Sequence, residues 1–362
     1  MDTITYAGVD LHKDSMTIAV TNSLSNDPYN EAKITKIHCK CVNKVSAFFA
    51  DLPHPCTVAV EAVGFYHWFW DLVSPLASDI YLLNAVEVRR YAGRDPKTDS
   101  RDARLIARLL ASNEITHNSK LSVFVPDNNL RPIRELARHR HQTARSLACS
   151  KNRFRRITLK ENLPGPKTLD AHHALRWIRG FENKTSDIHK FQLRQLTDQI
   201  ISFERDVSDI ERQILDLTNK AGYQPLMKLL QTIPGIGDVV AYTIIAEIGD
   251  FSRFQTAGQI ASFAGLTPRV FQSGDSCRHG SINKQGPPNL RWVLQQSAWV
   301  AIRHSEFIRK IFNKISRKAG KKKAACAIAR KILVWSWAMA KNNTAFNKDF
   351  INKDKEKTER AA

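Results

Sequence analysis

The chain has 362 residues, 43% of them hydrophobic, and its 55 lysines and arginines outnumber its 35 acidic residues, for a net charge of +20. This length is enough for two or more domains, and the charge predicts a salt-sensitive attraction to nucleic acid phosphates. The sequence has no apolar run of about 20 residues, the length that spans a bilayer. It has no signal-peptide pattern and no Cys-x-x-Cys spacing among its 6 cysteines. We therefore expect a cytoplasmic protein without a membrane span, zinc ribbon or disulfide framework.

The first part of the chain predicts strands followed by alternating helices and strands. The expected elements are strands at residues 4–9, 16–21 and 33–42, a helix at 45–52, a strand at 57–60, a helix at 65–76 and a strand at 80–84. The first strand ends at Asp10 and the fourth at Glu61, and strand ends are the usual place for chemistry in α/β folds. This order predicts a sheet of the ribonuclease H type, with both acids at one edge.

Two more carboxylates, Asp99 and Asp102, begin a helical stretch. Residues three apart share a helix face, so both can hold one cation, although Asp99 as an N-cap and Asp102 in the first turn would also suit the helix alone. Four clustered carboxylates repel one another without cations, and a pair of Mg²⁺ ions suits such oxygens in phosphodiester chemistry. We therefore predict a two-magnesium site of Asp10, Glu61, Asp99 and Asp102. His12, beside Asp10, is either a proton shuttle or, as we expect, a turn residue.

A strongly basic helical region covers residues 130–160, where only Glu135 opposes the cations. It is either a solvated face or, as we expect, a phosphate-binding surface. The candidates there are Arg138, Arg140, Lys151, Arg153, Arg155 and Arg156. Apolar residues then recur at helical spacing from 188 to 221, which predicts either a coiled coil or an intramolecular antiparallel helix pair.

The last third of the chain predicts a mostly helical domain. Residues 230–238 join two helical runs and resemble a helix-hairpin-helix, in which Gly235 and Gly237 let backbone N–H groups approach a phosphate. A tight turn with glycines at positive φ is the alternative. Residues 264–288 are rich in Gly, Ser and Pro and predict a loop or hairpin, followed by helices at 290–304 and 324–341.

Motifs along the whole chain resemble one known family. They are Gly8–Lys13, Val60–Ala62, Lys97–Ala103, Leu136–Arg140, Lys151–Arg153, Ile233–Gly237, Phe263–Pro268, Ser273–Gly274, Ile282–Gly286 and Leu290–Trp292. Their order and spacing resemble those of the DEDD-type insertion-sequence transposases related to the Piv DNA invertase, which are recombinases guided by a bridge RNA. The resemblance covers nearly all of residues 5–340.

The resemblance implies an N-terminal domain like the resolvase RuvC, with the four acids as metal ligands, and a serine nucleophile, Ser273, in the C-terminal domain. Ser276 takes that role if the motif is shifted. Lys284 and Arg291 are further candidate nucleic-acid contacts, although Lys284-Gln-Gly-Pro287 replaces the Lys-x-Gly-Asn that the family often has. DNA, a bridge RNA and further copies of the chain, as a dimer or tetramer, are the implied partners, near the nucleoid of a prokaryotic cell.

We expect four parts: a RuvC-like catalytic domain with the basic helix at 1–160, a helical coiled-coil linker at 161–222, a C-terminal transposase domain at 223–345 and a mobile tail at 346–362. The function indicated is that of a DNA transposase that cuts and rejoins DNA. Two alternatives stay open: a stand-alone RuvC-like structure-selective nuclease and a non-catalytic nucleic-acid-binding protein.

Overall fold

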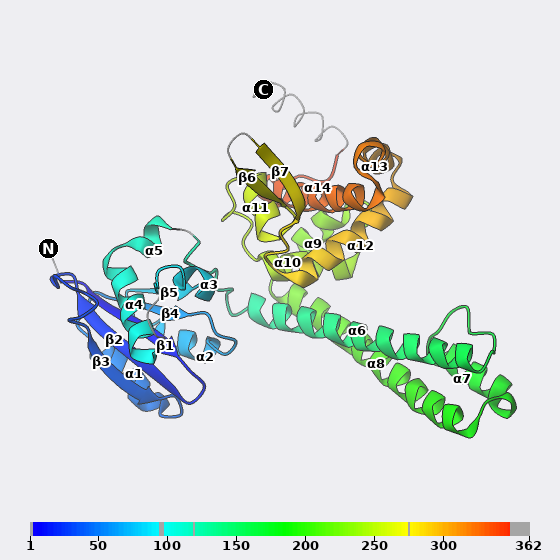
Figure 1. The fold of residues 1–362 in the computed structure, drawn as a ribbon, viewed down its shortest axis with the longest axis horizontal. Coiled ribbons are helices and arrows are strands. Elements are labelled where there is room, and N and C mark those ends of the chain that lie inside the picture. The colour runs from blue at the N-terminus through cyan, green and yellow to red at the C-terminus, as the bar shows by residue number, and fades with distance from the viewer. Residues whose placement is uncertain (1–2, 94–97, 119, 274–275, 348–362) are drawn as a thin grey trace. The chain divides into compact units, whose positions relative to one another are not determined.

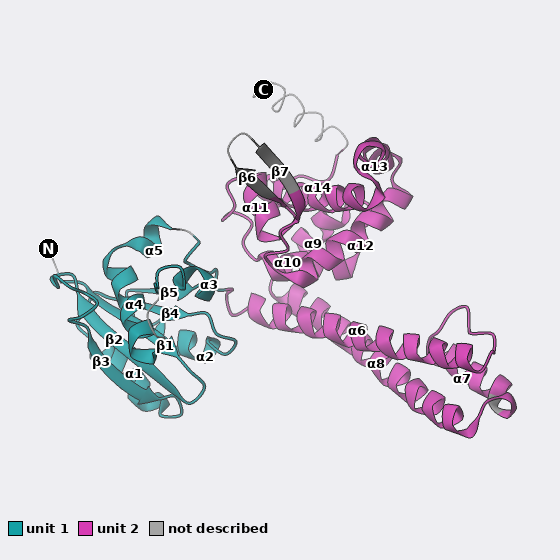
Figure 2. Ribbon diagram, viewed as in Figure 1, with its two compact units in different colours: residues 1–125 teal, residues 126–362 magenta. Residues whose placement is uncertain are grey.

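The structure is a computed structural model that describes residues 3–93, 98–118, 120–273 and 276–347. It divides into two compact units, residues 1–125 and residues 126–362, coloured separately in Figure 2. The basic helix expected at 130–160 therefore belongs to the second unit. The division of the chain into four functional parts stays a prediction, and its tail lies outside the described residues from 348 onward.

The first unit is built on a mixed sheet of five strands in the order β3-β2-β1-β4-β5. The strands are β1 (Thr5–Leu11), β2 (Ser15–Asn22), β3 (Lys33–His38), β4 (Cys56–Glu61) and β5 (Asp79–Leu83). The first three strands are antiparallel neighbours, whereas β4 and β5 run parallel to β1. This is consistent with the ribonuclease H-type arrangement expected from the sequence, and it puts the ends of β1 and β4 side by side.

Helices cover both faces of this sheet (Figure 1). On one face α1 (Val42–Ala50) and α2 (His67–Val73) pack against alternate strand residues such as Val9 and Val60. The other face is covered by α4 (Asp99–Ala111), whose Leu105 and Ile106 pack on it. The short helices α3 (Ala85–Val88) and α5 (Glu114–His117) complete the unit.

Gly8, at the centre of β1, sets how closely α4 approaches the sheet. A Cβ atom at this position would lie 2.3 Å from the backbone nitrogen of Ala107 and 2.4 Å from the carbonyl oxygen of Ala103. Such distances are far inside van der Waals contact, and the obstructing atoms are helix backbone, which cannot move aside alone. The lack of a side chain at Gly8 therefore seats α4 directly on the strand.

The second unit begins with two long helices, α6 (Leu130–Lys160) and α8 (Asp187–Lys220), which run side by side with α7 (Ala171–Phe181) and a short 3-10 turn (Glu182–Lys184) at one end (Figure 1). Phe154, Trp177 and Leu193 lie in their shared apolar core. The apolar residues from 188 to 221 predicted either a coiled coil or an intramolecular helix pair, and the structure has the intramolecular helix pair.

The rest of the second unit is a helical domain with one hairpin. Its elements are α9 (Gln224–Gln231), α10 (Asp238–Ile248), α11 (Ala257–Phe263), β6 (Pro268–Ser273), β7 (Ser276–Ile282), α12 (Pro288–His304), α13 (Glu306–Ala319) and α14 (Lys321–Asn342). The segment at 264–288, for which the sequence predicted a loop or a hairpin, thus contains an antiparallel hairpin. Within the described residues, no helix is both long and apolar enough to cross a bilayer.

Substituting Gly8 tests the seating of α4. We expect Gly8→Ala to lower the free energy of unfolding by about 2 kcal/mol or more, because overpacking against fixed backbone forces the helix away from the sheet. The control is Gly64→Ala, where a Cβ atom meets nothing within 4 Å. Thermal unfolding of both proteins measures the difference, and equal melting temperatures would show that α4 can shift without cost.

Candidate active site

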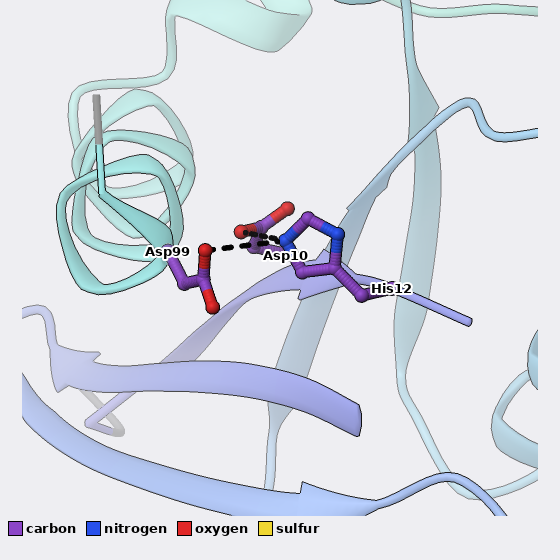
Figure 3. Close-up of side chains that lie close together, drawn as sticks. All are labelled: Asp10, His12 and Asp99. Atoms are coloured by element: carbon purple, nitrogen blue, oxygen red, sulfur yellow. Dashed lines mark hydrogen bonds and ion pairs between the residues drawn. The ribbon is translucent and has the colours of Figure 1, made fainter. Parts of the chain in front are cut away.

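Three side chains converge where β1 ends and α4 begins (Figure 3). His12 lies between two acids, its Nε2 atom 3.0 Å from Oδ2 of Asp10 and 3.3 Å from Oδ1 of Asp99. Asp10 and His12 are two residues apart, so both point to the face of the sheet that α4 covers. The hairpin turn holds the backbone at this point, since the N–H of His12 donates to the carbonyl of Ser15.

Asp10 is an acid in a buried position, with 5% of its surface exposed. Burial raises the pKa of Asp10 from 3.8 to about 6, because a carboxylate loses solvation there. His12 opposes this shift, whereas the negative charges of Asp102 and Asp99 add to it. A cation bound beside Asp10 would therefore strongly stabilise its ionised carboxylate.

The start of α4 fixes the other two acids. Thr98 is the N-cap, and its side chain accepts a hydrogen bond from the N–H of Arg101. Asp99 and Asp102 both lie in the first turn, where the helix dipole favours negative charge. The interpretation of Asp99 as the N-cap is therefore wrong, because Thr98 satisfies that position and leaves the Asp99 carboxylate turned toward Asp10.

Glu61 reaches the same region from β4. The paired residues of β1 and β4 end with Val9 and Val60, so Asp10 and Glu61 follow side by side on the adjacent strands. Glu61 and Asp102 also line one cavity of about 390 Å³, which the cationic residues Arg89, Arg101 and Arg108 line as well. The structure thus brings Asp10 together with Asp99, and Glu61 and Asp102 line a cavity at the same end of the sheet. Among the described residues, Glu61 and Asp102 do not join the close group of Asp10, His12 and Asp99.

The donors present fit a divalent cation. One ligand atom from each of Asp10, His12 and Asp99 lies within 4.8 Å of the others. Carboxylate oxygens are the ligands that Mg²⁺ prefers, and an imidazole nitrogen also suits transition metals. Divalent metal use is consistent with this site, and the choice of Mg²⁺ stays a prediction.

Sequence reasoning missed the place of His12 and Lys36. Both lie against Asp99, with Lys36 Nζ 3.7 Å from its Oδ2 atom. The strand register explains Lys36, because Asp10 pairs with Thr17 and Thr17 pairs with Lys36. The two-residue spacing of Asp10 and His12 was the signal that could have placed His12 in the site. Lys36 could be placed there only once the pairing of β1, β2 and β3 was known.

The two candidate nucleophiles lie in the second unit. Ser273 is the last residue of β6 and pairs through its backbone with Ser276, the first residue of β7. They therefore flank the turn of one hairpin, and residues 274–275 within that turn lie outside the described residues. The assignment of Ser273 stays a prediction.

Three of the predicted nucleic-acid contacts on α6 are bound to acids of the same unit. Nε and Nη2 of Arg138 donate to the two carboxylate oxygens of Glu247 at 2.9 and 2.7 Å. Arg140 donates twice to Glu211, and Lys151 donates to Glu204 at 2.7 Å. These cations hold α6 against α10 and α8, which adds a structural role to the predicted one.

The remaining candidates on α6 have open surroundings. Arg153, Arg155 and Arg156 are exposed, and within the described part of the chain none of them forms an ion pair. They fit the prediction of a phosphate-binding surface better than the three paired cations do.

The turn between α9 and α10 has the geometry of a tight helix connection. Gly235 has a φ of +92°, and a Cβ atom there would lie 2.5 Å from the carbonyl oxygen of Ser297. Gly235 is therefore needed for close packing on α12. Gly237 is the N-cap of α10, and nothing lies within 4 Å of its Cβ position. Of the two, Gly237 keeps the open backbone that a phosphate contact requires, and the helix-hairpin-helix stays a prediction.

Lys284 and Arg291 lie beside the hairpin. The Lys284 side chain is exposed, on a backbone with a φ of +58°. Nη1 of Arg291 donates to the carbonyl oxygens of Gly286 at 2.7 Å and Ala264 at 3.3 Å. Arg291 thus joins the motif at 263–268 to the motif at 282–286.

Comparison with known proteins agrees with this architecture. The DEDD transposase domain of IS110 elements, described as a transposase, matches residues 7–164, and the domain described as "Transposase IS116/IS110/IS902 family" matches residues 227–313. The two matches together span more than half of the chain and are domains of the same kind of element. The chain belongs to the IS110 family of insertion-sequence transposases.

Individual relatives are distant in sequence but cover most of the chain. The transposase of insertion sequence IS1328 from Yersinia enterocolitica is 24% identical over 96% of this chain and 100% of its own length. The pilin gene-inverting protein of Moraxella lacunata is 28% identical over 80% of this chain and 81% of its own. The putative transposase y4qE of Sinorhizobium fredii is 23% identical over 81% and 71%.

Asp10→Asn tests the buried acid in metal-free buffer. The folded pKa of about 6 lies above the ordinary 3.8, so ionisation of Asp10 costs stability as pH rises through that window. Asparagine does not ionise, and we expect the variant to exceed wild type above pH 6 by up to about 3 kcal/mol and to equal it below pH ~4. Added Mg²⁺ or Mn²⁺ should raise the melting temperature of wild type only. A variant no more stable than wild type at pH 7.5 in EDTA would contradict the raised pKa.

Arg138→Met tests the structural role of the α6 cations. Its partner Glu247 has only 2% of its side chain exposed, so the substitution leaves a buried carboxylate without its bidentate donor. We expect a loss of about 2–3 kcal/mol in the free energy of unfolding. Urea denaturation measures it, with the exposed Arg155→Met as control. If the two variants are equally stable, the ion pair does not hold α6 in place.

Proposed function

We propose that this protein is a DNA transposase that cuts and rejoins DNA at the ends of its insertion sequence. The observation that supports the proposal most is the grouping of Asp10 and Asp99 around His12, with Glu61 on the adjacent strand and Asp102 one turn along α4. These acids come from distant parts of the chain, and their repulsion has no structural benefit of its own. Membership of the IS110 family agrees with this reading.

In this proposal Asp10, Glu61, Asp99 and Asp102 hold two Mg²⁺ ions. Bound ions of this kind neutralise the scissile phosphate and activate the attacking and leaving oxygens. Arg89, Arg101 and Arg108, which line the same cavity as Glu61 and Asp102, offer positive charge to the DNA backbone. Lys36 lies 3.7 Å from Asp99, and the imidazole of His12 lies between Asp10 and Asp99.

Ser273 is the proposed nucleophile. Its Oγ atom forms a bond to phosphorus while the bond between phosphorus and the leaving sugar oxygen breaks. The serine gives up one proton and the leaving oxygen gains one, so the strand is cut without water and its bond energy is kept in the phosphoserine link. The reverse attack by a new strand end rejoins the DNA.

A bridge RNA is the proposed guide for target choice, and further copies of the chain are the proposed assembly. The net charge of +20 supports binding to nucleic acid phosphates, those of DNA and RNA alike. RNA guidance is tested by purifying the protein from cells that carry the flanking element DNA and sequencing the RNA that stays bound. Absence of any enriched RNA would leave a transposase that reads its DNA directly.

Covalent trapping tests the chemistry. Wild type incubated with labelled element-end DNA and Mg²⁺ should form a protein–DNA adduct that survives denaturation, and Ser273→Ala should form none, whereas Ser276→Ala should form it normally. Asp10→Asn should bind DNA with little change but lose adduct formation by a factor of about 10³ or more, as expected when electrostatic stabilisation of phosphoryl transfer is removed.

Other outcomes identify the alternatives. An adduct that persists in Ser273→Ala and vanishes in Ser276→Ala moves the nucleophile to the other strand of the hairpin. Free cleavage products without any adduct indicate a structure-selective nuclease. Binding without cleavage in every protein indicates a non-catalytic nucleic-acid-binding protein.

A further inference from the structure

The helix pair of the second unit has a groove of about 350 Å³ along one side, between α6 and α8. Its floor is apolar and nearly buried, formed by Ile157 and Leu196. Its polar lining consists of three cations on α6 and three carboxamides on α8: Arg153, Arg156, Lys160, Gln192, Gln195 and Gln199. One wall of the groove is therefore positively charged and the other is neutral and polar.

The spacing of these residues makes two matching rows. Arg153, Arg156 and Lys160 follow intervals of three and four, which puts them on one face of α6. The three glutamines on α8 repeat the same intervals. Ser150 Oγ donates to Gln199 Oε1 at 2.9 Å, and Glu161 at the end of α6 contacts His189. Because the helices run in opposite directions between these contacts, Arg153 lies at the Gln199 end of the groove and Lys160 at the Gln192 end.

The positive charge of the groove has no acidic counterpart among its lining residues. No acidic residue lines it, and none of its three cations forms an ion pair with a described residue. Lys151, on a neighbouring turn of α6, does have such a partner in Glu204. The groove therefore gathers three cations of α6 that remain available to an anion from outside.

The lining also limits what that anion is. There is no aromatic side chain among the lining residues, so the groove has no platform for base stacking. A row of cations beside an apolar floor fits a sugar–phosphate backbone, with phosphates on the arginines and lysine and sugars over Ile157 and Leu196. A carboxamide both donates and accepts hydrogen bonds, as does the ribose 2′-hydroxyl that deoxyribose lacks.

We propose that this groove binds the backbone of a single RNA strand, with the α6 cations at its phosphates and the α8 glutamines at its 2′-hydroxyls. The proposal rests on the RNA guidance proposed above and gives that RNA a place on the protein. It gives different roles to two groups of α6 cations. Arg153, Arg156 and Lys160 meet RNA, whereas Arg138, Arg140 and Lys151 hold the fold.

The test measures binding of a fluorescein-labelled, mixed-sequence RNA strand to the full chain by anisotropy over a range of salt. Arg153→Gln with Arg156→Gln should weaken binding about tenfold or more and reduce the slope of log K against log salt by about 1.4, the value for two lost phosphate contacts of a single strand. The control pair is Arg145→Gln with Arg179→Gln. These substitutions remove the same charge at two exposed arginines outside the groove.

A second pair of variants tests the carboxamide wall. Gln192→Leu with Gln195→Leu should lower the affinity for RNA to that for DNA of the same sequence, while the affinity for DNA stays unchanged. Gln195→Glu, an isosteric change that adds a negative charge, should weaken both. Unchanged thermal unfolding of each variant shows that the fold is intact.

Each failure has a separate meaning. Equal losses in the groove pair and the control pair would show a general charge effect and overturn the groove. A wild type that binds RNA and DNA equally, with glutamine variants that do not alter the ratio, would overturn the assignment to RNA. If wild type and the groove variants bind RNA equally tightly, the groove is not the RNA-binding site, although the proposal of RNA guidance is unaffected. Absence of copurified RNA would instead count against the guidance.

Discussion

The contact between Gly8 and the backbone of α4 is the constraint on which the candidate active site depends. The acids of α4 lie in its first turn, and they reach Asp10 only because the helix sits directly on β1. A helix raised by even one methyl group would move Asp99 and Asp102 away from the strand ends. The residue without a side chain is therefore as important to the site as the residues with carboxylates. It also explains why Ala103 and Ala107, the helix residues that meet Gly8, are small and buried.

A cluster of acids in a chain of net charge +20 requires local compensation. Lys36 and the imidazole of His12 lie against Asp99, and the pKa of the neighbouring Asp10 is nonetheless raised to about 6. Burial, rather than neighbouring charge, is the main cause of that shift. The site thus combines a desolvated acid with more exposed ones, so that a cation entering it gains the most at Asp10, where solvent competes least.

The sequence predicted those features that depend on local pattern. Strand and helix periods located the sheet, the acids at strand ends and the start of α4 to within a few residues, and motif order indicated the family. Other features depend on residues far apart in the chain. Glu211 lies 71 residues after Arg140 and Glu247 lies 109 after Arg138, and nothing in the basic run at 130–160 reveals those partners. The role of Thr98 as the cap of α4 was missed for a different reason, since Asp99 beside it is an equally good cap by residue type.

The α6–α8 pair shows how one basic helix can serve two purposes. Arg140 and Lys151 are about three helical turns apart, so they share a face, and that face meets the carboxylates Glu211 and Glu204 of α8. Toward the α7 end of the pair, the polar α8 side chains that line the groove are glutamines instead of acids. The change from carboxylate to carboxamide along α8 leaves the cations of α6 without partners over that stretch. A glutamine keeps the polarity of a glutamate but has no charge. The glutamates of α8 therefore hold the helices together at one end of the pair, and the glutamines leave a positive groove at the other.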